Sequence, residues 1–546
     1  MAEWRDEQTP PGSSSVKQPF GGTRSNLVPP LFILIPALLI GVLILIPPCY
    51  LLIRSVGSGS SAMDILTSQR TLEILLRTLL LMLSVSFFCC ILGVSLAWLT
   101  VKTNMPLRKV IGIFTSLPLV IPSYVFGLLA ITVLGPYGKL QQFLEPIGVE
   151  KIPSFYGFWG ATFVLVFLSY PYVMLPVRAA FKRIDPAFEE AARGLGKNAT
   201  QTFFSITLPM LRPSIVAGAL LVALYTLSDF GAVSLLRYQT FTWAIFIQYE
   251  TAFDRSIAAA LSLVLVGVAL ILVFVESFSQ GKSRYYRISP GNQRTDKIVD
   301  LGAWRWVALA YSSAVIGLSL VMPVSILVYW VIRGISVGER FDLLWEHTFN
   351  TVSIAFFAAL VTAIAAIPIA VLNVRYKSRI SIAIERMTYV GFALPGLAVA
   401  LAFVFFGTAV PNPLYQTTTI LVIAYLVLFL SASVGSTQAA LLQISPRLEE
   451  ASRSLGKSSL QSFRLITLPL ALRGIFAGSG LVFLLTMKEL PATLILSPPG
   501  FRTLATSIWS AASEAFFARA ALPALVLILI AGVPMALLLI RENNKD

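Results

Sequence analysis

Charged side chains are scarce in this 546-residue chain, and cysteine and histidine are almost missing. Asp, Glu, Lys and Arg make up 12% of the residues, against 56% hydrophobic residues, which excludes an ordinary water-soluble globular protein. The three cysteines, Cys49, Cys89 and Cys90, all fall in apolar segments, so we expect small buried packing residues and no disulfide framework. The single histidine, His347, falls in an expected external loop and is interpreted as a surface residue.

Long apolar runs recur from one end of the chain to the other. Runs of about 20 residues match the ~30 Å hydrocarbon layer of a bilayer, whereas the shorter alternating segments of a membrane β-barrel are absent. The sequence therefore predicts an all-α integral membrane protein with about twelve transmembrane helices. The expected spans are 31–53, 74–100, 110–134, 158–180, 213–236, 257–278, 306–332, 350–374, 387–410, 418–442, 474–496 and 520–540.

The basic residues indicate the orientation of these helices. Most of the 41 Lys and Arg residues fall in loops on one side of the predicted membrane, so the positive-inside rule places that side and both termini in the cytoplasm. This distribution accounts for most of the +15 net charge. Because the basic residues are spread over short loops and form no single patch, we expect no nucleic-acid partner.

The chain contains an internal duplication. A Glu-Glu-Ala-Ala sequence at 189–192, followed by Gly196, recurs 260 positions later as Glu-Glu-Ala-Ser at 449–452, followed by Gly456. Each copy continues into Ile-Thr-Leu-Pro, so the similarity marks two repeats. Six crossings separate the copies, so the halves are expected to be parallel and related by a pseudo-two-fold axis along the membrane normal. The predicted parts are a disordered cytoplasmic tail (1–30), a first half (31–280), a cytoplasmic linker (281–305) and a second half (306–541).

Two further pairs of motifs support the duplication. Arg77-Thr78 matches Asn350-Thr351, and Leu117-Pro118 is paired with Leu394-Pro395. Counted from the proline of this second pair to the first glutamate of the repeat, the first half has 17 more residues than the second. The extra residues fall around the external loop 135–153. We therefore expect an asymmetric outer face and an asymmetric partner there.

The repeated segment has the local signals of a short helix pair. Pro186 and Pro446 suit the first turn of a helix, and Asp185 and Ser445 precede them as candidate N-caps. Gly196 and Gly456 are expected to end this helix in a left-handed conformation, before a second helix enters the membrane. A plain amphipathic surface hairpin is the alternative, but two copies at fixed spacing favour a functional role.

This repeat resembles the "EAA" coupling loop of the permease subunits of binding-protein-dependent ABC importers. The matching positions are Glu189, Glu190, Ala191, Ala192 and Gly196 in the first copy, and Glu449, Glu450, Ala451, Ser452 and Gly456 in the second. The resemblance implies a transport subunit of a bacterial inner membrane that is not itself an enzyme. It also implies two cytoplasmic ATPase subunits as partners, an extracytoplasmic binding protein, and no tightly bound cofactor, because ATP acts on the partner.

A possible nucleotide-binding motif overlaps the second repeat. Ala451 through Gly456-Lys457-Ser458 fits a loose Walker A pattern, but a phosphate-binding loop must follow a β-strand and open a helix. Here the glycine is expected to end a helix, and the first copy has Asn198 in place of the hydroxyl residue. We therefore do not expect this chain to bind ATP itself.

A second pair of equivalent residues lies within predicted spans. Asp229 and Glu489 are 260 positions apart, and ionisable groups inside a membrane usually face the interior of the helix bundle and serve a function. Gly231 and Pro491 just after them can break the helix. The two carboxylates are therefore predicted to line a substrate pathway near the pseudo-two-fold axis. In the alternative, Lys488 or Arg237 neutralises a carboxylate in a purely structural pair.

The segments around these acids resemble the iron(III) branch of the same importer family. The resemblance lies in residues 229–236, 488–493 and 497–501, and ferric iron prefers carboxylate and phenolate oxygens. We predict transient metal contact by Asp229 and Glu489, with Tyr225 on the pathway and Tyr124, Tyr170 and Tyr172 as further phenols. A fused permease of similar layout could instead import thiamine. A secondary transporter without an ATPase and a membrane-embedded enzyme are more distant alternatives.

Overall fold

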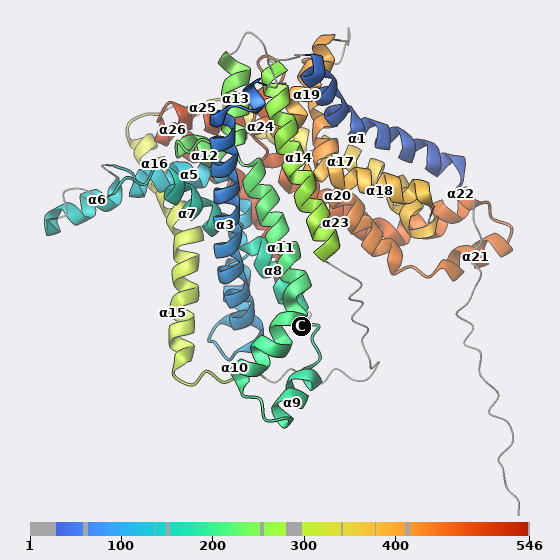
Figure 1. Ribbon diagram of the computed structural model, residues 1–546, viewed down its shortest axis with the longest axis horizontal. Helices are drawn as coiled ribbons and strands as arrows, with labels where there is room; N and C mark the ends of the chain where they lie inside the picture. Colours follow the sequence, from blue (N-terminus) through green and yellow to red (C-terminus); the bar gives the residue numbers. More distant parts are fainter. Residues whose placement is uncertain are drawn as a thin grey trace, which may run out of the picture.

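The computed structural model describes residues 29–57, 64–136, 138–148, 153–251, 256–279, 298–339, 342–376, 378–409 and 415–543. These residues form helices, joined by turns and by one isolated bridge between Thr103 and Val299 (Figure 1). The predicted disordered tail, except for its last two residues, and most of the predicted linker lie outside the described residues.

In the part of the chain that the structure describes, the first half contains thirteen α-helices and three short helical turns. They are α1 (Leu31–Gly57), α3 (Gln69–Lys102), α4 (Arg108–Phe114), η1 (Leu117–Val120), α5 (Ser123–Leu134), α6 (Lys139–Leu144), η2 (Glu145–Ile147), α7 (Phe158–Ser169), α8 (Pro171–Phe181), α9 (Pro186–Gly194), α10 (Ala199–Thr202), η3 (Phe203–Thr207), α11 (Leu208–Ser228), α12 (Gly231–Leu235), α13 (Phe241–Thr251) and α14 (Ser256–Ser279).

Among its described residues, the second half follows the same general order without counterparts of η1, α6 and η2, with α15, η4 and α16 in place of α1 and with α20 in place of α7 and α8. Its elements are α15 (Trp304–Ile316), η4 (Gly317–Val321), α16 (Met322–Ser336), α17 (Leu344–Arg375), α18 (Arg379–Ala393), α19 (Gly396–Ala409), α20 (Thr418–Leu442), α21 (Pro446–Ser454), α22 (Ser459–Ser462), η5 (Phe463–Thr467), α23 (Leu468–Met487), α24 (Pro491–Leu496), α25 (Leu504–Ser513) and α26 (Phe517–Asn543).

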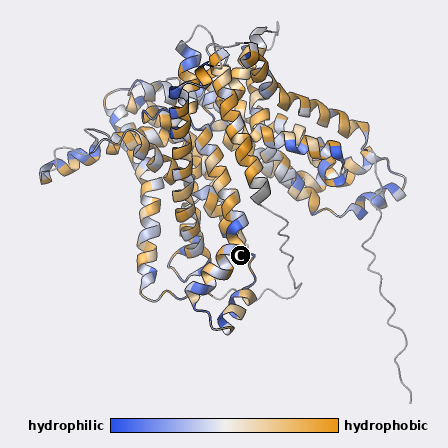
Figure 2. Ribbon diagram, viewed as in Figure 1, coloured by the Kyte–Doolittle hydropathy of each residue, from blue (hydrophilic) through white to orange (hydrophobic). Residues whose placement is uncertain are grey.

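The number of membrane spans agrees with the prediction. Within the described residues, eleven helical segments are long and apolar enough to cross a bilayer, and a twelfth arises if α18 and α19, bent by 103°, count as one span. Hydrophobic residues cover these long helices, whereas hydrophilic residues mark α9 and α21 at two separate ends of the molecule (Figure 2). The protein is therefore an all-α membrane protein built from two repeats.

Two of the predicted spans are broken at an extended residue that precedes a proline. The segment predicted as 110–134 is divided into α4, η1 and α5, and the segment predicted as 387–410 is divided between α18 and α19. Proline explains both breaks, because it lacks the amide hydrogen and disfavours helical backbone in the residue before it. Ile121 before Pro122 and Leu394 before Pro395 are both extended, with ψ of 124° and 125°.

These backbone angles correct one pairing of the repeat. Pro395 is equivalent to Pro122, not to Pro118, so the offset between the halves is 273 residues at this point. The same offset relates Thr78 to Thr351, and both hydroxyls accept from a backbone amide that opens a short helix, Phe241 at 3.0 Å and Leu504 at 2.8 Å. The offset falls to 260 at the acidic pairs, so the first half has 13 extra residues rather than 17. They lie between α5 and α7, where α6 and η2 are found.

The two halves exchange their outer helices. Helix α1 packs on α17, α18 and α19 of the second half, and α16 packs on α5 of the first half. Accordingly, one hydrophobic core combines the second half with residues of α1 and α14, such as Ile44 and Leu265. The other combines the first half with residues of α16 and α26, such as Leu327 and Leu527. The boundary between the cores therefore differs from the boundary between the sequence repeats.

Small residues allow the closest helix contacts. A Cβ atom added to Gly218 of α11 would lie 2.6 Å from the Cα atom of Val173, and one added to Gly93 of α3 would lie 2.8 Å from the Cβ atom of the same valine. Lipid tails are as apolar as side chains, so packing rather than the hydrophobic effect holds such helices together.

Enlarging Gly218 is therefore expected to destabilise the first half. The substitution Gly218→Val should lower the stability by about 1–3 kcal/mol, because α8 must move away from α11. The measurement is thermal unfolding of the purified protein in detergent. Gly480→Val is the matched control, because an added Cβ atom there meets nothing within 4 Å. Equal melting temperatures for the two variants would contradict the close contact at Val173.

Two predictions about single residues are wrong. His347 lies in the first turn of α17 and is buried rather than being a surface loop residue, because this helix begins before the predicted span. Cys89 is buried as expected and Cys90 is partly buried, but Cys49 is exposed on the outer side of α1. A helix at the edge of a membrane bundle presents apolar side chains to lipid, so an apolar segment does not by itself place each residue in a core.

Candidate functional site

The two repeated loops fold into equivalent helical hairpins. Helices α9 and α21 each have proline at their first position, and Gly196 and Gly456 follow them with φ of 84° and 81°. These two features are as predicted. The N-caps differ: Asp185 accepts from the amide of Ala187 at 3.0 Å, whereas Ser445 stands in the same position without a side-chain capping bond. The N-cap role predicted for the Ser445 side chain is therefore wrong.

The second helix of each hairpin continues into the membrane. Asn198 and Ser458 cap α10 and α22 by accepting from the amides of Gln201 and Gln461. Each short helix then passes through a π-helical turn, η3 or η5, directly into α11 or α23. Ser458 thus caps a helix and follows another helix rather than a β-strand, so the loose Walker A pattern is not a phosphate-binding loop.

The two glutamates of each repeat lie in different environments. The Thr207 hydroxyl donates to Glu189 Oε1 at 2.9 Å, and the Thr467 hydroxyl donates to Glu449 Oε1, also at 2.9 Å. The first glutamate of each pair therefore joins the hairpin to the π-helical turn of its own membrane helix. Glu190 and Glu450 instead have exposed side chains.

The second hairpin has an additional ion pair. Arg375 at the end of α17 contacts Glu449 Oε1 through Nε at 3.0 Å and donates to the carbonyl of Ile444 at 3.0 Å. The equivalent residue in the first half is Lys102, which is buried, whereas Arg375 is partly buried. The ion pair therefore holds the second hairpin beside the end of α17.

The projecting surface of each hairpin carries an apolar side chain at its tip. Leu195 and Leu455 are 85% and 83% exposed, and Phe188 and Leu448 on the preceding helices are also exposed. Ala192 and Ser452 face inward and are buried, whereas Ala191 and Ala451 are exposed. The two tip leucines were missed by sequence reasoning. The available signal was an apolar residue just before the helix-ending glycine, conserved between the two copies.

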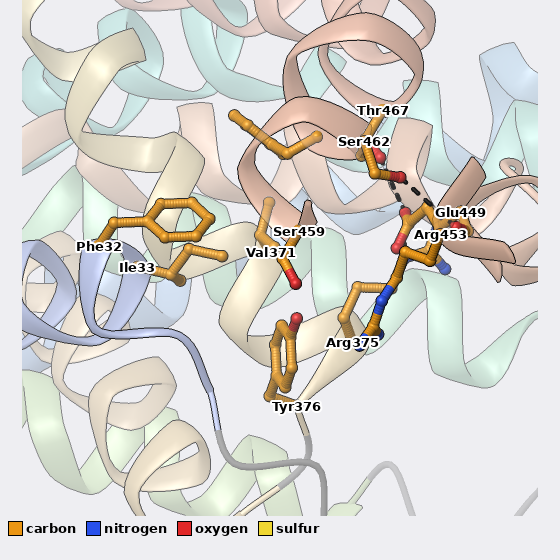
Figure 3. Close-up of a pocket in the computed structure, with 11 residues that line it drawn as sticks. Phe32, Ile33, Val371, Arg375, Tyr376, Glu449, Arg453, Ser459, Ser462 and Thr467 are labelled. Atoms are coloured by element: carbon orange, nitrogen blue, oxygen red, sulfur yellow. Dashed lines mark hydrogen bonds and ion pairs between the residues drawn. The ribbon is translucent and has the colours of Figure 1, made fainter. Parts of the chain in front are cut away.

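A cavity lies between the second hairpin and the start of α1 (Figure 3). Phe32 and Ile33 of α1 form an apolar wall, and Phe32 and Phe463 have ring centroids 6.4 Å apart. Arg375, Glu449 and Tyr376 contribute polar groups. Burial raises the pKa of the Tyr376 hydroxyl, and the nearby Glu449 carboxylate adds to that increase. The exchanged helix α1 therefore reaches the hairpin of the opposite half.

The membrane acids lie where two long helices break. Helix α11 ends at Ser228 and α12 begins at Gly231, while α23 ends at Met487 and α24 begins at Pro491. Asp229 Oδ1 accepts from the amides of Ala232 at 3.1 Å and Val233 at 3.3 Å. Glu489 accepts from the amides of Ala492 and Thr493, each at 3.1 Å. Each carboxylate therefore caps the short helix that follows the break, and capping side chains satisfy amides that a helix start leaves unpaired.

Neither basic residue suggested as a counter-ion pairs with these acids. Lys488 Nζ donates to the carbonyl of Leu119 at 2.9 Å, and the Arg237 guanidinium lies 5.1 Å from the ring centre of Tyr156. The structural alternative, in which one of these cations neutralises a carboxylate, is therefore replaced by helix capping. Because capping uses only part of a carboxylate's acceptor capacity, it leaves room for a further contact.

Tyrosines surround the two breaks. The Ser123 side chain lies beside both the Asp229 carboxylate and the Tyr225 hydroxyl, and the rings of Tyr225 and Tyr172 have centroids 5.6 Å apart. Tyr124 is buried, and a Cβ atom added to Gly231 would lie 2.7 Å from its Cβ atom. Tyr425, which sequence reasoning missed, bonds Thr493 next to Glu489 at 2.6 Å. Tyr170 lies elsewhere, near Tyr311 and Ser319.

Both breaks lie on the boundary between the two hydrophobic cores. Leu227 belongs to the core around the second half, whereas Phe230 belongs to the core around the first. At the other break, Leu490 belongs to the core around the first half and Ala492 to the core around the second. Among the described residues, no group of three or more His, Cys, Asp and Glu could hold a metal ion. The arrangement is thus a pair of carboxylates with neighbouring phenols where the two hydrophobic cores meet.

Comparisons with known proteins identify the same protein family in both halves of the chain. The family model described as "binding-protein-dependent transport system inner membrane component" matches twice, at residues 90–284 and 358–541. The chain is 36% identical to the Fe(3+)-transport system permease protein FbpB 2 of Haemophilus influenzae, over 93% of this chain and 98% of that relative. It is 26% identical to the ferric transport system permease protein FbpB of Actinobacillus pleuropneumoniae, over 74% of this chain and 62% of that relative.

A shorter relative supports the duplication. The chain is 28% identical to the sulfate transport system permease protein CysT of Salmonella typhimurium, over 46% of this chain but 91% of that relative. Nearly the whole of a single permease thus corresponds to about half of this chain. With two matching segments, two hairpins and two broken membrane helices, the chain belongs to the family of binding-protein-dependent transport system inner membrane components and contains that component twice.

Proposed function

We propose that this chain forms the whole transmembrane path of an ABC importer for ferric iron. The main support for ferric iron as the substrate is the similarity to the Fe(3+)-transport permease, which extends over nearly the full length of both chains. Two carboxylates and several tyrosines at the boundary between the cores supply the oxygen donors that a hard, highly charged cation prefers. Their positions on broken helices match the way in which transporters expose backbone and polar groups to a substrate within a membrane.

The proposed partners bind at opposite faces of the membrane protein. An extracytoplasmic binding protein delivers iron to the outer face, and the 13 extra residues around α6 make that face asymmetric. Two ATPase subunits bind the hairpins α9 and α21, which project from the bundle at separate places (Figure 1). Both chain termini are cytoplasmic, because the basic residues gather on the side of the hairpins.

The proposed mechanism transmits force along continuous helices. Closure of the ATPase pair moves each hairpin, and the Glu189–Thr207 and Glu449–Thr467 bonds join this movement to α11 and α23. Both membrane helices end at the acid-bearing breaks. ATP-driven movement of the hairpins therefore reaches the boundary between the cores and exposes the pathway alternately to its two sides.

Uptake by reconstituted vesicles tests which substrate the importer carries. Vesicles that contain the permease and its ATPase subunits, supplied with the binding protein, should accumulate radiolabelled ferric iron in an ATP-dependent manner. Radiolabelled thiamine and sulfate, tested in the same vesicles, should not accumulate. Accumulation of thiamine or sulfate instead of iron would reject the substrate assignment, and uptake without an ATPase subunit would reject the importer class.

The tip leucines provide a test of the ATPase contact. Leu195→Asp together with Leu455→Asp should prevent co-purification of the ATPase subunits, because each new carboxylate would lose its water on entering an apolar contact. Val337→Asp is the control, since Val337 is also an exposed apolar residue (74% exposed), following α16. Undiminished co-purification of the double variant would exclude the leucine tips from the contact.

A further inference from the structure

Lys488 makes a contact that joins the two halves inside the membrane. It follows the last residue of α23, and its Nζ donates to the carbonyl of Leu119 in η1 at 2.9 Å. The ammonium group also lies 5.9 Å from the ring centre of Tyr225 in α11. Both contacted residues belong to the first half, whereas Lys488 belongs to the second. The side chain therefore crosses from the second half of the sequence to the first.

The local environment explains why a cation is stable there. The last carbonyls of a helix carry partial negative charge, and Leu119 is next to last in η1 while Lys488 itself caps the carboxyl end of α23. An aromatic face adds a further favourable contact with an ammonium group. A charged group within a membrane otherwise costs several kcal/mol, so losing these contacts would be unfavourable unless another partner replaced them.

This contact occurs once, although the fold is duplicated. The residue equivalent to Lys488 is Ser228, at an offset of 260, and the residue equivalent to Leu119 is Phe392, at an offset of 273. A serine side chain is too short to reach across as lysine does. The asymmetry shows that the lysine is not required to build a break of this kind, because α11 and α12 form the same break without one.

The contact lies directly beside the proposed pathway. Glu489 follows Lys488 in the chain, and Tyr225, whose ring the ammonium group covers, lies beside Ser123 and Asp229. A highly charged cation that reaches these carboxylates would repel the ammonium group at short distance. Arrival of the cargo would thus weaken the Lys488–Leu119 bond at the moment when the halves need to part.

We propose that Lys488 is the positioning residue that holds the two halves together while the pathway is empty, and that a cation bound between Asp229 and Glu489 displaces it. This inference rests on the proposed function for its cargo. The bond across the boundary stabilises the resting arrangement, and its loss couples the presence of cargo to the movement that accompanies ATP hydrolysis. A ligand can shift such an equilibrium only through different contacts in the two states, and repulsion of Lys488 supplies that difference.

The test compares ATP hydrolysis by the complete complex in lipid nanodiscs. Without any binding protein, Lys488→Met should hydrolyse ATP about five- to tenfold faster than the unsubstituted complex, as typical coupling between sites would give. Iron-loaded binding protein should then stimulate it little further. Lys488→Arg should restore the low resting rate, because a long cation can still reach the Leu119 carbonyl. Ser228→Ala, at the equivalent position, should leave the resting rate low.

Two outcomes would overturn the proposal. One is a resting rate for Lys488→Met equal to that of the unsubstituted complex, in a preparation with the same amount of bound ATPase subunit. The other is an equal increase for Ser228→Ala, which would indicate general disturbance of the helix breaks. The resting rates of ATP hydrolysis are measured without cargo. They therefore test the role of Lys488 independently of the substrate assignment. Failure of iron-loaded binding protein to stimulate the unsubstituted complex would instead count against the proposed function.

Discussion

Reversing the charge of Glu190 and Glu450 together is expected to reduce ATP-dependent iron uptake to the background of vesicles without ATP. Both side chains are exposed on the projecting helices α9 and α21, where we propose that the ATPase subunits bind. Glu190→Arg with Glu450→Arg would place a positive charge where the partner surface accommodates a negative one, and mismatched charges across an interface cost several kcal/mol. Uptake and co-purified ATPase are the two measurements.

The control for this double variant is a charge reversal elsewhere on the surface. Glu145→Arg changes an exposed glutamate in η2, far from both hairpins in the chain, and should leave ATPase binding intact. Glu189→Gln with Glu449→Gln forms a second comparison. Glutamine keeps an oxygen that can accept from Thr207 and Thr467, so the hairpins should still assemble with the ATPase. Normal uptake in the Glu190→Arg and Glu450→Arg variant would refute the docking role.

Removing the negative charge from Asp229 and Glu489 should reduce iron uptake by about a hundredfold. Each carboxylate is expected to make one charge-assisted contact with the cation, worth about 1.5 kcal/mol or more, and about 1.4 kcal/mol corresponds to tenfold in rate. The informative variant is Asp229→Asn with Glu489→Gln. Their amide oxygens can still accept from the amides of Ala232 and Ala492, so the helix breaks should persist.

A second variant separates charge from capping. Asp229→Ala with Glu489→Ala removes both the charge and the caps, and losing an N-cap typically costs about 1 kcal/mol of stability. If the acids act on the cargo, both double variants lose uptake, and only the alanine variant also melts at a lower temperature. If the acids are only caps, the Asn and Gln variant transports iron normally. The melting curve and the uptake rate together decide between these roles.

Much of the fold could be predicted because a bilayer restricts the structures that can cross it. Backbone polar groups must be satisfied within each segment, so an apolar run of sufficient length becomes a helix. The twelve predicted spans and the two hairpins rest on this restriction and on the repeated 260-residue spacing. The left-handed Gly196 and Gly456 were predictable for a similar reason, since glycine adopts positive φ without steric cost.

The division of roles within the site could not be read from the sequence. Glu189 and Glu190 are adjacent and chemically identical, and only the packing of α9 against η3 directs one to Thr207 and leaves the other exposed. In the same way, Lys488 beside Glu489 suggested an ion pair. The break after Met487 directs the glutamate to the amides of α24 and the lysine to the opposite half.

The sequence by itself determined the membrane class, the two repeats, the hairpins and the pair of acids, because each depends on local chemistry or on spacing along the chain. The tertiary structure alone decided that α1 and α16 exchange places between the halves and that both helix breaks lie where the two cores meet. These features depend on contacts between residues hundreds of positions apart. Lipid provides no hydrophobic preference for one helix neighbour over another, so the fit of small residues such as Gly218 against Val173 selects the arrangement.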